Sequence, residues 1–189
     1  MNSFDNSYLF SEDTVTVANW ITCPHSSLRS VNPNYYPSPN QLLPITEIYE
    51  RLLPMVGLCI DYLNPLQERN RGAELHALIC QHLGYSVYED DGSYPDIANQ
   101  LLEIKLQTSP TIDLGLHSPE DGAPIVTIGD TTFYSDDVRY VIFDGSVEGH
   151  YIRLNRLYVV AGYEFTNHFP LFKGQNAKIQ LPLPTNFFN

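Results

Sequence analysis

Two carboxylates and an amine stand close together in the middle of the chain: Asp96, Glu103 and Lys105. Glu103 and Lys105 are separated by one residue, so on a β-strand their side chains lie on the same face. Asp96 comes just before a short turn at Asn99-Gln100, and a hairpin folded there brings Asp96 near Glu103. We therefore expect these three side chains to converge at one edge of a β-sheet.

Such a cluster suits the hydrolysis of a phosphodiester. The carboxylates of Asp96 and Glu103, with a backbone carbonyl such as that of Ile104, are the hard oxygen ligands that Mg²⁺ prefers. The metal polarises a phosphate oxygen and lowers the pKa of a bound water molecule. Lys105 beside that water would orient it and stabilise the charge that develops on the phosphate. The plainer alternative is that Asp96 caps a turn, while Glu103 and Lys105 lie on a solvated strand face.

The motif resembles the signature of the PD-(D/E)XK nuclease superfamily. Pro95-Asp96, then six residues, then Glu103-Ile104-Lys105 matches that signature literally, and the flanking pattern of helix, strand, turn and strand agrees with it over residues 66–145. The preceding helix supplies Glu74, and members of the superfamily often carry an acidic residue on this helix that supports the metal site. A surface glutamate is the alternative for Glu74.

Within the superfamily the chain is most similar to the type II restriction endonucleases. This resemblance implies a restriction-endonuclease-like core, Mg²⁺ as the cofactor, and cleavage of double-stranded DNA at a specific sequence. It also implies a cytoplasmic homodimer, with a cognate DNA methyltransferase protecting the host. Three alternatives stay open: a DNA-repair or structure-specific nuclease of the same superfamily, a catalytically inert nucleic-acid-binding or assembly module, and a protein-interaction domain with a fortuitous motif.

Several other side chains are candidates for contact with DNA. Gln107 follows Lys105 on the same strand face and could touch the phosphate or the water. The tail after Glu148 is mildly basic and supplies four candidates for phosphate contact, Arg153, Arg156, Lys173 and Lys178. For all of these side chains an ordinary surface position is the alternative.

The histidines and cysteines give no strong metal motif. His76 and Cys80 are four residues apart on a predicted helix, and a zinc site there would need distant partners such as Cys23 or His25. We interpret His76 and Cys80 as packing residues. His117 lies in a predicted loop after the motif, where a histidine needs no special role.

The charge of the chain argues against DNA. The 189 residues carry a formal net charge of −12, whereas DNA-binding domains are usually basic. The acidic residues crowd the segment from Glu89 to Glu148, in which Lys105 and Arg139 are the basic residues. An acidic centre is typical of a metal site or of a solvated face, so the motif must outweigh the net charge.

Length and composition predict one globular domain without a membrane partner. Hydrophobic residues make up 43% of the chain and charged residues 17%, as in folded proteins of this size. No window is apolar enough to span a membrane, and the N-terminal sequence lacks the basic and apolar blocks of a signal peptide. Three widely spaced cysteines form no disulfide framework.

The elements that must position the motif follow from periodicity. Apolar residues at helical spacing predict a helix over 45–63, kinked or split by Pro54, and a second over 66–83, ended by Gly84. Strands are predicted over residues 85–89, 95–98, 101–107, 125–128, 140–143, 151–154, 157–160 and 178–183.

These elements sum to an α+β fold with a mixed sheet flanked by helices. Residues 1–40 are polar and rich in proline, and we expect an irregular N-terminal arm or the remnant of a larger region. Residues 41–189 are then the nuclease domain, which ends in a C-terminal DNA-contacting or dimerisation segment.

Overall fold

The protein is described by a computed structural model that covers residues 7–24, 26–61, 68–88, 91–109, 111–114, 117–119, 121–169 and 180–182. The helices are α1 (Val15–Trp20), α2 (Ile45–Leu52), α3 (Glu68–Leu83) and α4 (Gly162–His168). The strands are β1 (Tyr8–Leu9), β2 (Cys59–Asp61), β3 (Leu102–Gln107), β4 (Thr111–Asp113), β5 (Pro124–Ile128), β6 (Thr131–Tyr134), β7 (Arg139–Glu148), β8 (Tyr151–Ala161) and β9 (Gln180–Pro182). Short 3₁₀ helices cover Leu53–Met55, Ala98–Gln100 and Ser135–Asp137.

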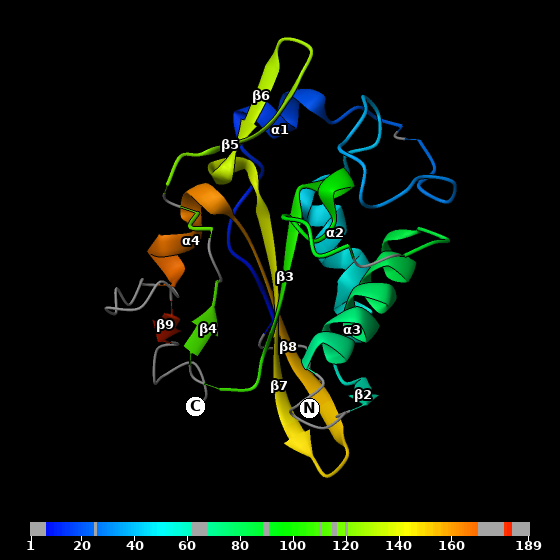
Figure 1. Ribbon diagram of the computed structural model, residues 1–189, viewed down its shortest axis with the longest axis vertical. Helices are drawn as coiled ribbons and strands as arrows, with labels where there is room; N and C mark the ends of the chain where they lie inside the picture. The colour runs from blue at the N-terminus through cyan, green and yellow to red at the C-terminus, as the bar shows by residue number, and fades with distance from the viewer. Residues whose placement is uncertain are drawn as a thin grey trace.

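A mixed sheet forms the centre of the molecule, in the order β1-β8-β7-β3. β7 and β8 are the two arms of a long antiparallel hairpin, and β3 runs parallel to β7. β2 and β1 both pair with the other edge of β8, the former antiparallel and the latter parallel. The mixed sheet and its flanking helices confirm the predicted α+β class (Figure 1).

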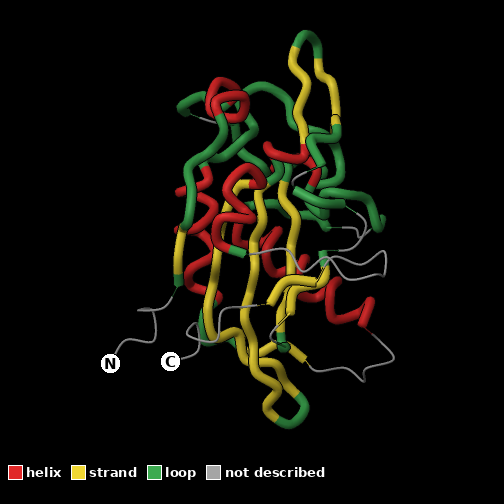
Figure 2. The backbone as a smooth tube through the Cα atoms, turned by 90° about the vertical axis from the view of Figure 1, so that its left-hand side faces the viewer, coloured by secondary structure: helices red, strands yellow, loops and turns green. Residues whose placement is uncertain are grey.

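Both faces of the sheet are buried. α2 and α3 cover one face, while α4 and the β4–β9 pair lie on the other (Figure 1), and the view turned by 90° shows the central strands side by side (Figure 2). Along β7, Val141 and Phe143 pack toward the helical side, whereas Tyr140 and Ile142 pack toward the opposite cluster. Burial on both faces explains why residues 140–143 form an unbroken apolar run rather than an alternating one.

The two long helices follow their apolar stripes. On α3, Leu75, Ile79 and Leu83 recur at four-residue spacing and are at most 1% exposed. Gly84 follows with a positive φ of 103°, so the predicted helix over residues 66–83 and its glycine end are confirmed in the described residues.

The break predicted at Pro54 is confirmed, but the second half of the helix predicted over residues 45–63 is wrong. α2 ends at Leu52, and Pro54 lies in the 3₁₀ turn that follows, because proline cannot donate the backbone hydrogen bond of a helix interior. Gly57 then adopts a φ of 95°, and the chain enters β2, which pairs with β8. The helical pattern after Leu52 therefore belongs to a turn and a strand.

Two of the predicted strands near the motif are also wrong. Residues 85–88 form no strand, since Tyr85 packs against the core and donates its hydroxyl to Asn99 instead of joining a ladder. Residues 95–98 contribute only an isolated bridge between Ile97 and Leu102. The strand predicted over residues 101–107 is confirmed as β3.

The described part of residues 1–40 is less irregular than expected. β1 adds a strand to the central sheet, and α1 begins with Thr14 as its N-cap. Val17 of α1 is fully buried, and the Trp20 indole packs edge-on against Phe133 at 5.1 Å. These contacts attach the N-terminal segment to the body of the fold.

The remaining strands make two small sheets. β5 and β6 form a hairpin that projects at the top of Figure 1, beside α1. β4 pairs with β9, so the extended piece predicted over residues 178–183 is present where it is described. Among the described residues, no helix combines the length and apolar character needed to cross a membrane.

Candidate active site

Asp96 sits in a tight turn that the N-terminal half of the protein holds in place. Ile97 and Leu102 exchange backbone hydrogen bonds of 2.9 and 3.1 Å across this turn. Asn99 and Gln100, which the sequence places in a hairpin turn, are fully buried. Their side chains bond inside the protein, since Gln100 accepts from the Leu43 amide at 2.9 Å and Asn99 accepts from the Tyr85 hydroxyl at 2.7 Å.

The three residues of the motif converge as predicted. The Asp96 Oδ2 atom accepts a hydrogen bond from the Ile104 amide at 2.7 Å, and the Asp96 amide donates to Glu103 Oε2 at 3.3 Å. The Lys105 Nζ atom lies 2.8 Å from Glu103 Oε1. Two carboxylates and an ammonium group are thereby joined at the edge of β3.

This cluster is shielded from water to different degrees. The Glu103 side chain is 7% exposed, the Lys105 side chain 19% and the Asp96 side chain 21%. Glu103 is the most buried of the three side chains, and Asp96 and Lys105 are more accessible to a ligand from solvent. Such partial burial strengthens every charge interaction within the cluster.

Burial perturbs the charge state of Glu103. Its pKa is raised from 4.5 to about 7, first by desolvation and then by the neighbouring Asp96 carboxylate, while the Lys105 ammonium opposes the shift. A carboxyl group with such a pKa is a mark of functional sites, because ordinary surface glutamates ionise well below neutral pH. The site therefore disfavours its full negative charge unless a cation balances it.

Two tyrosines line the other side of Glu103. Tyr140 is the strand partner of Glu103 on β7, and its hydroxyl lies 2.9 Å from that of Tyr94. The pKa values of both tyrosines are raised by burial, and the charge of Glu103 raises them further. The His117 ring stacks on Tyr94 at 4.1 Å, which gives this loop residue a place beside the site that the sequence did not reveal.

The donor set fits Mg²⁺ through two carboxylates. The amide and carbonyl of one strand residue point to the same edge, so the Ile104 carbonyl lies at the edge where its amide meets Asp96. Among the described residues, no three His, Cys, Asp or Glu side chains are grouped to hold a metal ion. Mg²⁺ commonly uses one or two carboxylates and completes its shell with water and substrate phosphate, so Asp96, Glu103 and the Ile104 carbonyl are the groups that would hold it here.

Glu74 is not brought into this group. Its side chain is half-buried on α3, but it forms no three-acid cluster with Asp96 and Glu103 in the described part of the chain. His76 is a described residue of α3 that faces Asp96, since its Nε2 atom lies 3.8 Å from Asp96 Oδ2. His76 directly follows the buried Leu75, at the border of the apolar stripe of α3. This position next to the buried face is the feature of the sequence that could have indicated His76 as a site residue.

The described residues predicted to contact DNA lie on β3 and β8 of the central sheet. Gln107 is buried, and its amide nitrogen donates to Ser109 at 2.5 Å and 2.6 Å. Arg153 pairs with Glu148 at 3.0 Å in the exposed β7–β8 hairpin. Arg156 is half-buried on β8. Burial raises the pKa of the neighbouring Asp144, and the charge of Arg156 opposes that rise.

The last two predicted DNA-contacting residues, Lys173 and Lys178, lie outside the described residues. The structure therefore places Asp96, Glu103, Ile104 and Lys105 together. Gln107 on β3 and Arg156 on β8 both stand opposite Asp144 of β7, and Arg153 lies nearer the end of the β7–β8 hairpin.

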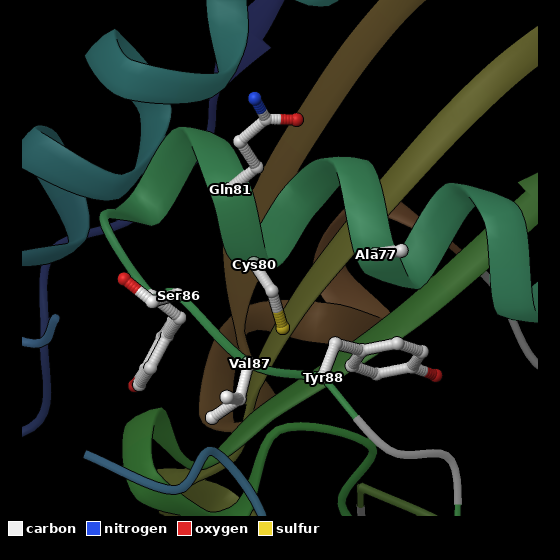
Figure 3. Close-up of a pocket in the computed structure, with 7 residues that line it drawn as sticks. Ala77, Cys80, Gln81, Ser86, Val87 and Tyr88 are labelled. Carbon is white, nitrogen blue, oxygen red and sulfur yellow. The ribbon is translucent and has the colours of Figure 1, made fainter. Parts of the chain in front are cut away.

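A pocket of about 540 Å³ opens between α3 and residues 85–88. In Figure 3 the Cys80 side chain points from α3 toward Val87 and Tyr88. Tyr88 also lies 2.7 Å from His76 through its hydroxyl, so the pocket wall and the Asp96 side of the site share a residue.

Comparisons with known proteins leave the site to be judged on its own geometry. No protein-family model matches the chain, and searches of curated proteins and of solved structures gave no significant match.

Proposed function

We propose that this protein is a Mg²⁺-dependent endonuclease that hydrolyses phosphodiester bonds of double-stranded DNA. The observation that supports this proposal best is the convergence of Asp96, Glu103 and Lys105 at the edge of β3. The literal PD-(D/E)XK motif gives the same three residues. A solvated strand face would not account for Glu103, whose side chain is 7% exposed and contacts both the Asp96 amide and the Lys105 ammonium group.

Each residue has a role that its position supports. The Ile104 amide fixes one oxygen of Asp96 and so aims the carboxylate along the strand edge. Glu103 supplies the second carboxylate from a buried position, where its proton is lost when a cation binds. Mg²⁺ bound there would polarise the phosphate and acidify a water molecule. Lys105 holds its ammonium beside Glu103, where it stabilises negative charge developing on the phosphate.

The acidity of the chain is compatible with this function only if a cation takes part. A net charge of −12 repels a polyanion, and Asp96 and Glu103 would face the scissile phosphate. At an effective dielectric near 20, like charges about 4 Å apart cost on the order of 4 kcal/mol. A divalent cation between the carboxylates and the phosphate turns this repulsion into attraction.

The finer assignment is a type II restriction endonuclease acting as a homodimer on a symmetric sequence, with the methyltransferase partner that such enzymes have. Two-fold symmetry in the enzyme matches two-fold symmetry in the target, so each protomer cuts one strand. A repair or structure-specific nuclease with the same site is the second candidate. The excess of acidic residues favours a protein-interaction domain with a fortuitous motif as the third.

The deciding experiment incubates the protein with phage DNA and with supercoiled plasmid in Mg²⁺ or in EDTA. We expect cleavage in Mg²⁺ alone, with discrete fragments for a sequence-specific enzyme and cutting confined to branched or damaged substrates for a structure-specific one. Asp96→Asn and Glu103→Gln should abolish cleavage. Glu50→Gln, an exposed glutamate on α2, is the matched control and should cut normally.

Two results would contradict the proposal. Persistent cleavage by Asp96→Asn or Glu103→Gln at the rate of Glu50→Gln would remove the site from the reaction. Intact DNA in every substrate class, together with a folded protein, would favour the two non-catalytic alternatives, the inert nucleic-acid-binding module and the protein-interaction domain. Light scattering of the protein, free and on DNA, tests the homodimer separately.

A further inference from the structure

Asp96 is contacted from α3 by a histidine that the motif does not include. The His76 Nε2 atom lies 3.8 Å from Asp96 Oδ2, and the His76 side chain is 11% exposed. The other ring nitrogen, Nδ1, lies 2.7 Å from the Tyr88 hydroxyl, and the two rings meet edge-on at 5.8 Å. Tyr88, His76 and Asp96 thus form a continuous chain of polar contacts that ends on a proposed metal ligand.

The partners of His76 favour one tautomer. A tyrosine hydroxyl that donates to Nδ1 leaves the ring proton on Nε2, which is the atom that faces the Asp96 carboxylate. The opposite tautomer would turn a nitrogen lone pair toward a negative oxygen. At 3.8 Å the Nε2 contact is too long for a direct hydrogen bond, so it acts on Asp96 through electrostatic attraction.

We infer that Tyr88 and His76 are positioning residues that hold the Asp96 carboxylate in the orientation needed for metal binding. This inference rests on the proposed function. His76 is placed to act through Asp96, because its Nε2 atom faces the Asp96 Oδ2 atom. The same oxygen accepts from the Ile104 amide at 2.7 Å. The hydrogen bond from β3 and the electrostatic contact from α3 together restrict rotation of the carboxylate more than either does alone.

The position of Tyr88 adds a structural consequence. Tyr88 lies on the segment that follows α3, and its ring forms part of the pocket wall shown in Figure 3. α3 is packed into the core by Leu75 and Ile79, so His76 is presented from a rigid element. The orientation of Asp96 therefore depends on the packing of residues 85–88 against α3. Loss of the Tyr88 hydroxyl should for this reason weaken Mg²⁺ binding at Asp96.

The test compares Tyr88→Phe, His76→Gln and His76→Ala with wild type. Tyr88→Phe removes only the hydroxyl and keeps the ring contact. His76→Gln retains an N–H donor that can reach toward Asp96, whereas His76→Ala removes it. Two matched controls are His82→Gln, on the same helix with its Nδ1 atom near the Leu78 carbonyl, and Tyr49→Phe, which loses a hydroxyl bond to Ser7.

Two readouts separate a positioning role from a structural one. The first is Mg²⁺ affinity without DNA, measured by calorimetry and by the metal-induced rise in Tm. The second is kcat and KM for DNA cleavage at several Mg²⁺ concentrations. Second-sphere partners of metal ligands typically contribute 10- to 100-fold to metal affinity or activity. We expect about tenfold weaker Mg²⁺ binding in Tyr88→Phe and His76→Ala, partial rescue in His76→Gln, and a rate restored by higher Mg²⁺.

The outcomes distinguish this inference from the proposed function. If the wild type cleaves DNA but the Tyr88 and His76 variants bind Mg²⁺ as tightly as the two controls do, the positioning role is overturned. The proposed nuclease function is unaffected by that result. A variant that loses Tm without metal, while its Mg²⁺ affinity is unchanged, would likewise show a structural role. Absence of both cleavage and Mg²⁺ binding in wild type would refute the proposed function itself.

Discussion

Glu103→Gln should make the protein more stable at alkaline pH, although it removes a residue of the proposed site. In the folded protein the pKa of Glu103 is raised from 4.5 to about 7, mainly by burial and then by Asp96. The folded state therefore binds this proton more tightly than the unfolded state does. Between about pH 4.5 and 7 the free energy of unfolding falls as pH rises, because the ionised carboxylate is held in an unfavourable place.

The size of the effect follows from the shift. One pKa unit corresponds to about 1.4 kcal/mol, so a rise from 4.5 to about 7 corresponds to about 3 kcal/mol. Relative to Glu103→Gln, the free energy of unfolding of the wild type should fall by about 3 kcal/mol between pH 4.5 and pH 8. This decrease should level off above the pKa of Glu103 in the folded protein. Mg²⁺ should reverse much of it in wild type, since a ligand that binds the native state stabilises it by mass action.

Urea denaturation of wild type, Glu103→Gln and the control Glu50→Gln at several pH values, in EDTA and in Mg²⁺, measures these differences. The free energy of unfolding of Glu103→Gln should gain on wild type as the pH rises, and that of Glu50→Gln should stay parallel to wild type. A difference between wild type and Glu103→Gln that does not change from pH 4.5 to 8 would refute the argument from burial.

Lys105→Ala should lower kcat by about 10²- to 10³-fold while metal-dependent DNA binding persists, because the ammonium acts on charge that develops in the transition state. Cleavage kinetics and DNA binding measured in parallel check this prediction. An equal loss of DNA affinity would show that Lys105 anchors the phosphate instead. DNA affinity should be at least tenfold higher in Ca²⁺ than in EDTA, and Glu103→Gln should reduce this difference in affinity by removing one negative charge. Equal DNA affinities of the wild type in Ca²⁺ and in EDTA would show that the carboxylates do not face the phosphate. Gly162→Ala should lower the free energy of unfolding, measured by urea denaturation, by about 1–3 kcal/mol, since an added Cβ would lie 2.4 Å from the Ser135 carbonyl oxygen. A variant more stable than wild type would show that the backbone around Gly162 relaxes to admit the Cβ.

The site could be predicted because its geometry is local. Glu103 and Lys105 are two residues apart on one strand, and Asp96 returns to them across a turn of a few residues, so strand periodicity alone brings them together. His76 escaped prediction because its partners, Tyr88 and Asp96, lie 12 and 20 residues away and are joined to it only by the packing of α3.

The turn beside the motif shows why other features could not be predicted. Asn99 and Gln100 are typical turn residues, and their composition suggests exposure. They are buried because the segment before α2 supplies partners for them, including the Pro33 carbonyl for the Asn99 amide and the Leu43 amide for the Gln100 side chain. Arg139, also fully buried, donates to the Gln100 backbone carbonyl. Partners this distant in sequence leave no periodic signal.

The strand predicted over residues 85–89 fails for a related reason. Alternation of apolar and polar residues is typical of a strand, but a strand also needs a free edge on which to pair. The edge of β3 that faces Asp96 is already occupied, by the Ile97–Leu102 bridge and by the Asp96 carboxylate on the Ile104 amide. Residues 85–88 pack beside α3 instead and line a pocket there.

Asp96 therefore has two roles, and they must be separated experimentally. Its carboxylate is a proposed metal ligand, and it also satisfies a backbone amide at the edge of β3, where an unpaired donor would otherwise invite another strand. Asp96→Ala removes both functions and leaves the Ile104 amide without this acceptor, at a cost of about 1–3 kcal/mol. Asp96→Asn keeps a carbonyl oxygen for that amide and removes the charge. Because the asparagine retains the strand edge, its loss of activity, and not that of the alanine variant, isolates the contribution of the Asp96 charge to metal binding and catalysis.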